Sequence, residues 1–452
     1  MDLMAESSAH KYNGGFTPAL VCEDVFEPDG APCTSPGTAI TGEAGLYYFR
    51  GHGPYYDFLK ESPLYYGIEV SESSAAQHRI GLVPSLPIGR SSRSEPERSA
   101  RLSRRPLNVV HVGPFLARGG AEQSLIDLVQ AVDPQVLRFS RHIAISSNGA
   151  DPEYINELAG SGVVVEVGGA ESIQEAADEA DVILSWGVEL DRYLRGRPRP
   201  LSVQIVHGDG DWNRYFLDHS RASIDHAVAV SHRVQRRVCR DVPTTVIYNG
   251  IHGRRLARAR SRESTRAALG FHAGDFVAGF FGRLAAEKRI PAIIEGVARM
   301  PGHVKLLIVG QGHLEHELRT LAARLLPSRH AFTHAAGVMG DLYAASDAVC
   351  LASNQEGCSL VMLEAMLSGC PVVSTPVGAA CELLSNRITG LLFDGSPVGL
   401  AEALQLLDDY PQWRRALADE GRRNTERFGY ASRMARDYEH LLTNLWRQSR
   451  PA

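Results

Sequence analysis

The sequence predicts an α/β protein built from two doubly wound parallel-sheet domains. The chain has 452 residues, which is more than one hydrophobic core normally serves. From Leu107 onward, short apolar runs alternate with segments of helical periodicity, the pattern of a parallel sheet covered on both faces. The alternation breaks near residues 249–263 and then resumes, so two sheets are expected rather than one.

The composition narrows the class of protein. A hydrophobic content of 44% and a charged content of 22% are ordinary for a soluble globular chain, and a net charge of −5 does not indicate a nucleic-acid binder. Seven scattered cysteines without a C-x-x-C pair predict neither a zinc site nor a disulfide framework. The first residues lack a basic region followed by an apolar run, and no segment approaches ~18 apolar residues. We therefore expect a cytoplasmic protein with reduced thiols.

Residues 1–105 are expected to form an N-terminal extension of three parts. Residues 1–40 mix Ser, Gly, Pro and acidic residues without periodicity, which indicates loose order. Residues 46–68 hold eight aromatic residues, which we expect to pack on another surface, either as a cover or as a flap for an acceptor or partner. Residues 83–106 contain six arginines and read as an exposed basic linker, with peripheral contact to the cytoplasmic face of a membrane as an open alternative.

The first expected domain covers residues 106–250. It opens with a strand and an amphipathic helix over residues 121–132, whose apolar side chains share one face. The expected strands are residues 107–112, 142–146, 163–167, 181–185, 202–206, 226–230 and 245–248.

The second expected domain covers residues 251–430 and repeats the pattern. Its expected strands are residues 276–281, 305–309, 347–351, 371–374 and 390–393, and its expected helices are residues 287–300, 314–326 and 360–367. The Arg-rich residues 253–262 are expected to connect the domains with their charges in solvent. Residues 431–452 are expected to form a C-terminal helix.

The chemical centre of the sequence is the stretch from Glu356 to Glu364. Glu356 lies on a short loop between a buried strand and a helix, and Glu364 lies about two turns into that helix. Ligands of open parallel sheets sit at such strand ends, where the helix N-terminus holds phosphate or sugar oxygens. At ~1.5 Å of rise per residue the two carboxylates lie on the order of 10 Å apart, which suits two parts of one long ligand such as a nucleotide-sugar.

This stretch resembles the E-x7-E signature of retaining GT-B glycosyltransferases, especially glycosyltransferase family 4. Further motifs agree in order along the chain: Gly119-Gly120-Ala121-Glu122, Asn249-Gly250-Ile251, Gly282-Arg283-Leu284 followed by Glu287-Lys288, and Gly369-Cys370-Pro371-Val372-Val373. The similarity covers roughly residues 106–448. It implies a GT-B fold, in which a Rossmann-like acceptor domain faces a Rossmann-like donor domain and the last helix, here residues 430–446, crosses back onto the first domain.

The resemblance also implies a reaction. It is the transfer, with retention, of a hexose-type sugar from a nucleoside diphosphate sugar to an unidentified glycan, lipid-linked or small-molecule acceptor. Arg283 and Lys288 are expected to clamp the leaving diphosphate in place of a divalent cation, so neither metal nor cofactor is expected. Retention without an evident nucleophile resembles the front-face mechanism proposed for this family.

Each candidate residue of the first domain has two alternative interpretations. His207, at the end of a buried strand, is expected to contact the transferred sugar, or else to be a structural histidine. Asp209 and Asp211 either orient an acceptor hydroxyl or cap the following helix. Gly119 and Gly120 either close over the ligand or form a plain tight turn.

Candidate residues of the second domain follow the family pattern. Glu364 is expected to bind the ribose hydroxyls and Glu356 to approach the donor sugar. Cys358 and Ser359 replace the aromatic residue and the glycine or proline that often follow Glu-Gly in the family, so the donor cannot be named, and nothing marks Cys358 as an activated nucleophile. The backbone N–H groups from Gly357 on, and the glycine and valine of two further loops, complete the expected donor-binding set: Gly357, Cys358, Ser359, Leu360, Gly310 and Val338.

Two other functions share this pattern. A non-hydrolysing sugar-nucleotide epimerase would act on the donor alone, and a non-catalytic scaffold would bind a nucleotide-sugar and a partner. The intact set of Arg283, Lys288, Glu356 and Glu364 argues against a scaffold. The expected partners are a nucleotide-sugar donor and a sugar-bearing or lipid-linked acceptor, and nothing in the sequence indicates an oligomeric state.

Overall fold

The computed structural model describes residues 105–194, 199–334 and 339–449, together with six short strands before them. The chain divides into two compact units, Met1–Ser103 and Arg104–Ala452. In the first unit, β1 (Val21–Cys22) pairs with β2 (Gly37–Thr38), and a four-stranded antiparallel sheet has the order β3 (Ile40–Thr41), β4 (Tyr47–Phe49), β6 (Gln77–Leu82), β5 (Ile68–Ser73). The packing predicted for the side chains of residues 46–68 lies outside what the structure describes. The same is true of the predicted basic linker, residues 83–106, except for its last two residues.

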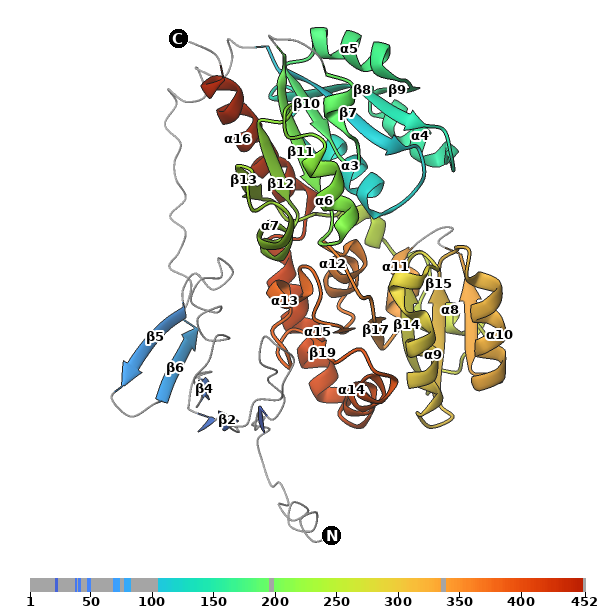
Figure 1. Cartoon of the computed structure of the whole chain (residues 1–452). Helices are drawn as coiled ribbons and strands as arrows, with labels where there is room; N and C mark the ends of the chain where they lie inside the picture. Colours follow the sequence, from blue (N-terminus) through green and yellow to red (C-terminus); the bar gives the residue numbers. More distant parts are fainter. Residues whose placement is uncertain are drawn as a thin grey trace. The chain divides into compact units, whose positions relative to one another are not determined.

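The second unit begins with a seven-stranded parallel sheet (Figure 1). Its order is β13-β12-β11-β10-β7-β8-β9, so the chain starts near the middle and builds outward in both directions. This reversal of strand order beside β7 marks the edge where a crevice for ligands forms. The strands are β7 (Leu107–Phe115), β8 (Leu137–Ser146), β9 (Val164–Val167), β10 (Val182–Ser185), β11 (Leu201–Val206), β12 (His226–Ala229) and β13 (Thr244–Val246).

A six-stranded parallel sheet forms the second domain, in the order β16-β15-β14-β17-β18-β19. Its strands are β14 (Phe276–Phe281), β15 (Val304–Val309), β16 (His330–Thr333), β17 (Ala348–Leu351), β18 (Val372–Ser374) and β19 (Leu391–Leu392). The strand β16 was not predicted. It lies at the sheet edge with all four residues only half-buried, so it lacks the continuous apolar run that reveals the inner strands.

Helices follow most strands of both sheets. In the first domain these are α3 (Gly120–Ala131), α4 (Pro152–Gly160), α5 (Ala170–Glu179), α6 (Asp211–Asp218) and α7 (His232–Val238). In the second they are α8 (Arg262–Ala268), α9 (Ile290–Ala298), α10 (Glu315–Leu325), α11 (Met339–Ala345), α12 (Leu360–Leu367), α13 (Ala380–Leu383), α14 (Pro397–Asp409) and α15 (Pro411–Glu426). Apolar side chains of α9, α10 and α14 pack with β14 and β15 into one buried core.

The predicted helix over residues 287–300 is wrong at its start. Residues Ala286–Lys288 form a 3-10 turn, and α9 begins only after Arg289, whose φ of 49° is left-handed. Pro291 lies in the first turn of α9, where its missing N–H breaks no hydrogen bond. Lys288 therefore stands on a turn that faces the first domain rather than inside the helix.

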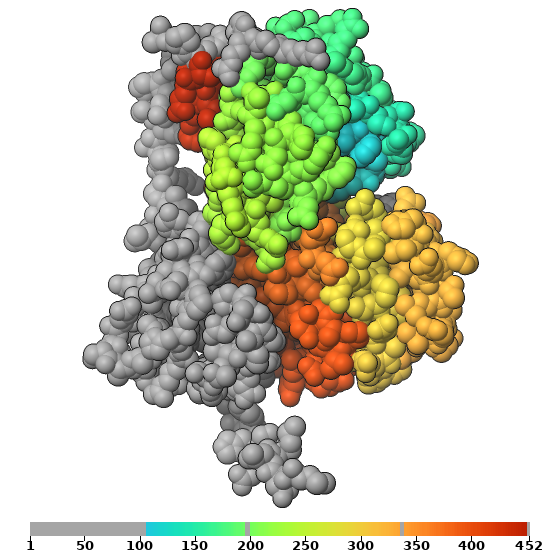
Figure 2. Space-filling model, viewed as in Figure 1, coloured from blue at the N-terminus to red at the C-terminus, as the bar shows by residue number. Residues whose placement is uncertain are grey.

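The last helix, α16 (Ala431–Gln448), returns to the first domain, as the GT-B fold class predicted (Figures 1 and 2). It packs on α3, where Ser124 Oγ lies 3.8 Å from Met434 Sδ and the N–H of Asp133 donates to Glu439 at 2.6 Å. Ile251 pairs with Tyr430 in an isolated bridge, so the two crossings between the domains lie side by side. No helix in the described part of the chain is long and apolar enough to span a membrane.

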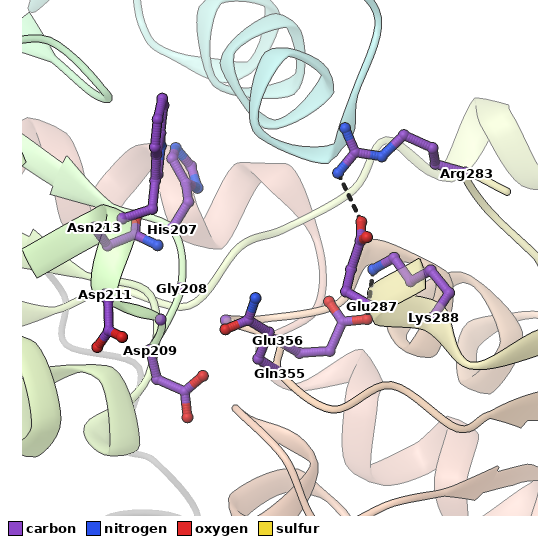
Figure 3. Close-up of a pocket in the computed structure, with 13 residues that line it drawn as sticks. His207, Gly208, Asp209, Asp211, Asn213, Arg283, Glu287, Lys288, Gln355 and Glu356 are labelled. Atoms are coloured by element: carbon purple, nitrogen blue, oxygen red, sulfur yellow. Dashed lines mark hydrogen bonds and ion pairs between the residues drawn. The ribbon is translucent and has the colours of Figure 1, made fainter. Parts of the chain in front are cut away.

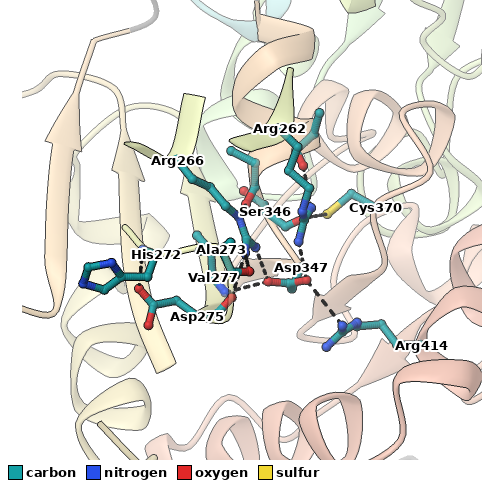
Figure 4. A network of polar contacts seen from close by, with 12 residues as sticks. Arg262, Arg266, His272, Ala273, Asp275, Val277, Ser346, Asp347, Cys370 and Arg414 are labelled. Carbon is teal, nitrogen blue, oxygen red and sulfur yellow. Dashed lines mark hydrogen bonds and ion pairs between the residues drawn. The ribbon is translucent and has the colours of Figure 1, made fainter. Parts of the chain in front are cut away.

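The predicted solvent exposure of the charges in residues 253–262 is confirmed for Arg254, Arg258 and Arg260 but is wrong for Arg255 and Arg262. Arg262 Nη2 lies 2.5 Å from Asp347 Oδ1, and the buried Arg266 Nη2 lies 2.5 Å from the other oxygen (Figure 4). The same oxygen accepts the N–H of Val277 at 2.8 Å. Asp347, just before β17, thus ties the connection and α8 to the second sheet. A buried carboxylate needs such partners, and a linear sequence does not show which arginine supplies them.

Candidate active site

A cleft of about 370 Å³ lies between the two domains at the carboxyl ends of their strands. Figure 3 shows His207, Asp211 and Asn213 on the side of the first domain, with Arg283, Lys288 and Glu356 across from them. The residues that line the cleft are His207, Gly208, Asp209, Gly210, Asp211, Trp212, Asn213, Arg283, Glu287, Lys288, Gln355, Glu356 and Gly357.

The floor of the cleft is a contact between two backbone loops. A methyl group on Gly357 would lie 2.0 Å from the carbonyl oxygen of His207, and one on Gly210 would lie 2.4 Å from Gln355 Oε1. Distances this short exclude a side chain at Gly357 unless the loops move, because a backbone oxygen cannot rotate away. The loop between β17 and α12, which carries Glu356, is called the signature loop below. Glycine at position 357 lets this loop touch the end of β11.

A row of charges forms the wall of the second domain. Lys288 Nζ lies 2.7 Å from Glu356 Oε1, and Ser353 Oγ donates to the same oxygen at 2.8 Å. Arg283 Nη2 lies 2.9 Å from Glu287 Oε1, and its side chain is 72% exposed. The structure therefore places both predicted clamp cations in one cleft with Glu356, and each has a carboxylate partner that an incoming anion can compete with.

Arg283 also acts across the cleft on Glu122, in the first turn of α3. Burial raises the pKa of Glu122 to about 7, while its own backbone N–H and Arg283 oppose that rise. The carboxylate folds back over Gly119, since a methyl group on this glycine would lie 2.5 Å from Glu122 Oε2. Gly119 precedes α3 in extended backbone and Gly120 opens the helix with no atom near its missing side chain. The end of the Glu122 side chain can rotate away from such a methyl group, so this contact does not require glycine at position 119, and no contact requires it at position 120.

His207 follows the last residue of β11 and is half-buried. Its ring meets the edge of the Trp186 ring at a centroid distance of 5.5 Å, and burial lowers the pKa of His207 to about 4. No hydrogen bond to this ring is present among the described residues, so the alternative of a histidine fixed by a loop carbonyl gains no support. At neutral pH the uncharged imidazole presents one donor and one acceptor.

The two aspartates after His207 differ in their surroundings. The Asp209 side chain is 2% exposed and lies 2.8 Å from Arg233 Nε and 3.2 Å from Arg237 Nη1. Those ion pairs give it a structural role. Asp211 is the first residue of α6, is exposed at the cleft, and forms no ion pair within the described ranges.

Glu364 is buried inside a polar cluster rather than open to the cleft. Tyr343 Oη donates to Oε2 at 2.6 Å, and Arg255 Nη2 lies 2.7 Å from Oε1, close enough for an ion pair though not aligned as a hydrogen bond. Arg255 Nη1 also lies 3.3 Å from Asp127 of α3. Burial raises the pKa of Glu364 and raises that of Asp127 to about 6, with Arg255 opposing both. Ribose binding by Glu364 stays a prediction, and it requires the ribose to share this carboxylate with Arg255.

The rest of the signature loop presents backbone rather than reactive side chains. Ser359 caps α12 by accepting the N–H of Met362 at 3.4 Å. The Cys358 carbonyl accepts Asn249 Nδ2 at 2.9 Å, and burial raises the pKa of the Cys358 thiol to about 12. Such a thiol is a poor nucleophile, in line with the expectation from sequence. Leu360 begins α12 and is buried.

Gly310 has a structural reason to be glycine. Its φ is 144°, and a methyl group there would lie 1.9 Å from the carbonyl oxygen of Gly282. The loops after β14 and β15 therefore pack backbone to backbone beside Arg283. Whether Gly310 also meets a nucleotide stays a prediction, and Val338 lies outside the described residues.

Several polar residues of the site were missed by the sequence analysis. The Glu382 carboxylate of α13 accepts the backbone N–H groups of His232 and Arg233 at 3.0 and 2.7 Å and the hydroxyl of Tyr248 at 2.7 Å. It holds the N-terminus of α7 from the opposite domain, where a negative charge is favourable. Asp127, Arg255 and Tyr343 were also missed. In the sequence, Asp127 has the same helical spacing as other polar residues of α3. Only its burial in the folded protein distinguishes it from a carboxylate on the surface, and the sequence does not show that burial.

The described residues contain no cluster of three or more His, Cys, Asp or Glu side chains suited to a metal ion. The five cysteines within the described ranges are free thiols: Cys239, Cys350, Cys358, Cys370 and Cys381.

Comparison with known proteins finds a family match within the second domain. Residues 275–409 match the family described as glycosyl transferases group 1. Over 247 residues the chain is 29% identical to the lipopolysaccharide core biosynthesis mannosyltransferase LpsB of Rhizobium meliloti, a match that covers 51% of this chain and 69% of the relative. Over 187 residues it is 32% identical to a D-inositol 3-phosphate glycosyltransferase of Rhodococcus erythropolis, covering 38% of this chain and 42% of that one.

The fold has close counterparts among solved structures. HepE of Anabaena, in complex with UDP, superposes with a TM-score of 0.65 at 22% identity, over 75% of this chain and 100% of HepE. WaaG, a glycosyltransferase involved in lipopolysaccharide biosynthesis, superposes with a TM-score of 0.59 at 17% identity, over 74% of this chain and 99% of WaaG. At these identities the superpositions show the fold alone. The described second unit therefore has the GT-B fold, and residues 275–409 within it match the group 1 glycosyl transferases.

Proposed function

We propose that the protein is a retaining glycosyltransferase that moves a sugar from a nucleoside diphosphate sugar to a hydroxyl group of a second substrate. The observation that carries the proposal is the placement of Arg283, Lys288 and Glu356 on one wall of the interdomain cleft. That wall lies within the part of the chain that matches the group 1 glycosyltransferases. The two relatives described above are named as transferases, and HepE has been solved with UDP and with UDP-glucose, which supports a nucleotide-sugar as donor.

The charges of this wall suit a diphosphate. Arg283 and Lys288 are fixed by Glu287 and Glu356 at 2.9 and 2.7 Å, so they stay near the cleft before a ligand arrives. A diphosphate that enters gains two charge-assisted contacts, and these strengthen as the bond to the sugar breaks and negative charge grows on the phosphate. This arrangement supplies the role that a divalent cation has in other transferases, so we propose that no metal is required.

We propose a front-face transfer step. The acceptor oxygen bonds to the anomeric carbon on the face from which the diphosphate departs, the bond from that carbon to the phosphate oxygen breaks, and the acceptor proton passes to the departing phosphate. Glu356 is held by Lys288 and Ser353, which favours a positioning role over that of a covalent nucleophile. Neutral His207 can hydrogen-bond a hydroxyl of the transferred sugar.

Nucleotide binding and donor cleavage test this proposal. UDP, GDP and ADP are titrated by calorimetry, and the corresponding sugar conjugates of the nucleotide that binds are then followed for release of nucleoside diphosphate. We expect one nucleotide to bind and its sugar conjugate to be cleaved slowly by water in the absence of an acceptor. Interconversion of one nucleotide-sugar into another would indicate an epimerase instead, and failure of all three nucleotides to bind would overturn the proposal.

A further inference from the structure

The wall of the cleft that belongs to the first domain has an aromatic side chain open to solvent. Trp212, the second residue of α6, lines the cleft and is 55% exposed. A large aromatic side chain that is exposed inside a cleft of otherwise polar residues leaves apolar surface in contact with water. Its position on a helix that opens at the cleft indicates that it meets a ligand there.

The Trp212 ring is supported from behind. Phe216, one turn further along α6, meets it edge to face at a centroid distance of 4.5 Å, and Tyr215 in turn meets Phe216 at 5.3 Å. The Tyr215 hydroxyl donates to Glu189 at 3.2 Å, and its ring stacks on His219 at 4.1 Å. The aromatic cluster thus holds Trp212 while leaving more than half of its surface open.

The polar groups beside Trp212 are oxygen acceptors and an amide. Asp211 is exposed without an ion pair among the described residues, and Asn213 Nδ2 would lie 3.0 Å from a methyl group on Gly208, so the amide rests on the loop that lines the cleft. Asp209 is already neutralised by Arg233 and Arg237. Of the lining residues, both cations, Arg283 and Lys288, belong to the second domain.

We propose that Trp212, Asp211 and Asn213 form a subsite for an uncharged sugar ring of the acceptor. This inference rests on the proposed function and names the class of its second substrate. The negative face of an indole attracts the C–H groups of a pyranose ring, Asp211 accepts hydrogen bonds from its hydroxyls, and the Asn213 amide can donate and accept. An acceptor phosphate at this position would meet the Asp211 carboxylate, and no arginine or lysine of the first domain is among the residues that line the cleft, so like charges disfavour it.

Direct binding tests the subsite without requiring turnover. Saturation-transfer NMR is recorded on the full chain with methyl α-mannopyranoside and methyl α-glucopyranoside as neutral probes, and with mannose 6-phosphate and glucose 6-phosphate as charged ones. We expect saturation of at least one neutral probe and several-fold less of its phosphate. Trp212→Ala should remove most of the saturation, whereas Tyr410→Ala, which removes a similarly exposed aromatic side chain between α14 and α15 outside the cleft, should keep it. Asp211→Asn should narrow the difference between neutral and charged probes.

The outcomes separate this inference from the proposed function. Calorimetry with the nucleoside diphosphate reports the donor side of each variant independently and shows that the variant is folded. Nucleotide binding without saturation of any neutral probe, preference for the phosphates, or equal effects of Trp212→Ala and Tyr410→Ala would each overturn the subsite and leave the donor proposal standing. Sugar binding that depends on Trp212, without binding of any nucleotide, would overturn the donor proposal instead.

Discussion

Lys288 Nζ lies 2.7 Å from Glu356 Oε1, and this contact joins the turn before α9 to the signature loop after β17. The Lys288 and Glu356 side chains are 21% and 17% exposed, so the pair is partly shielded from water yet open to the cleft. Lys288 is thus held in the cleft by a carboxylate that a diphosphate can outcompete. In this way the structure connects two motifs whose paired residues lie 68 positions apart in the sequence of the second domain.

Removal of either clamp cation should lower turnover. We expect Lys288→Ala and Arg283→Ala each to reduce kcat/KM by roughly 10²-fold, the usual scale for losing one charge partner of a transition state. Initial rates of nucleoside diphosphate release check this. Arg433→Ala is a matched control, because it removes an arginine from an exposed i, i+4 ion pair on α16. Rates in both clamp variants equal to those of the control would exclude a catalytic role for the pair.

A side chain at position 357 should push the domains apart. In Gly357→Ala the new methyl group would lie 2.0 Å from the carbonyl oxygen of His207, so the loops that form the cleft floor must shift. We expect transfer to fall more than tenfold and the Tm to drop. Gly160→Ala, at the end of α4 where no atom approaches the missing side chain, is the control and should change neither. An active Gly357→Ala protein would show that the close approach of the loops is not needed.

Neutralising Glu364 should weaken nucleotide binding. Glu364→Gln turns a charged hydrogen-bond acceptor into a neutral one, and we expect a loss of about 1–3 kcal/mol of affinity for the nucleoside diphosphate. Calorimetry measures the change, and the Tm shows separately how far the contacts to Arg255 and Tyr343 depend on the charge. If affinity stays the same, the ribose is held elsewhere and the cluster around Glu364 only joins the domains.

The buried Asp127 predicts a pH dependence of stability. Its pKa is raised from 3.8 to about 6 in the folded protein, chiefly by burial. Between these values the folded state binds more protons than the unfolded state, so this group's contribution is complete below pH 3.8 and is lost as the pH rises through about 6.

Denaturant unfolding at several pH values tests that sign. His207, whose pKa is lowered by burial, contributes in the opposite direction over the same range, so the informative quantity is the difference between wild type and Asp127→Asn. We expect the difference in unfolding free energy to change by on the order of 1–3 kcal/mol between pH 4 and 6. A difference that does not vary with pH would mean that Asp127 titrates normally in the folded state.

Chelation should leave the reaction intact. If Arg283 and Lys288 carry the charge of the leaving diphosphate, addition of EDTA to protein purified without divalent cations should change the rate by less than about twofold. A loss of activity that Mg²⁺ or Mn²⁺ restores would show that the clamp needs a metal.

The sequence predicted the parts of the fold that leave a local pattern. The helix over residues 360–367 has the predicted bounds, because Ser359 caps it and its apolar residues are continuous. The edge strand His330–Thr333 was missed because its burial is only partial, and the start of α9 was misplaced because a left-handed Arg289 leaves no mark in the sequence.

Partners of the site residues depend on contacts between distant segments. The Glu356–Glu364 spacing and the cation pair were visible in the sequence, but the pairing of Glu364 with Arg255 and Asp127 was not. Arg255 stands among several arginines of one segment, and only the folded chain shows that it is the one between two buried carboxylates. The same holds for Glu382, whose role depends on α7 of the other domain.

The most direct test of the account is the anomeric form of the sugar released from its donor. Proton NMR of the first minutes of donor cleavage distinguishes the anomers before they interconvert. The Lys288→Ala variant is the control that shows whether cleavage depends on the cleft. The account predicts that the wild-type protein cleaves one nucleoside diphosphate sugar, that the sugar forms first with the anomeric configuration of the donor, and that the variant is at least tenfold slower. Cleavage with the opposite configuration, or at the same rate in Lys288→Ala, would contradict it.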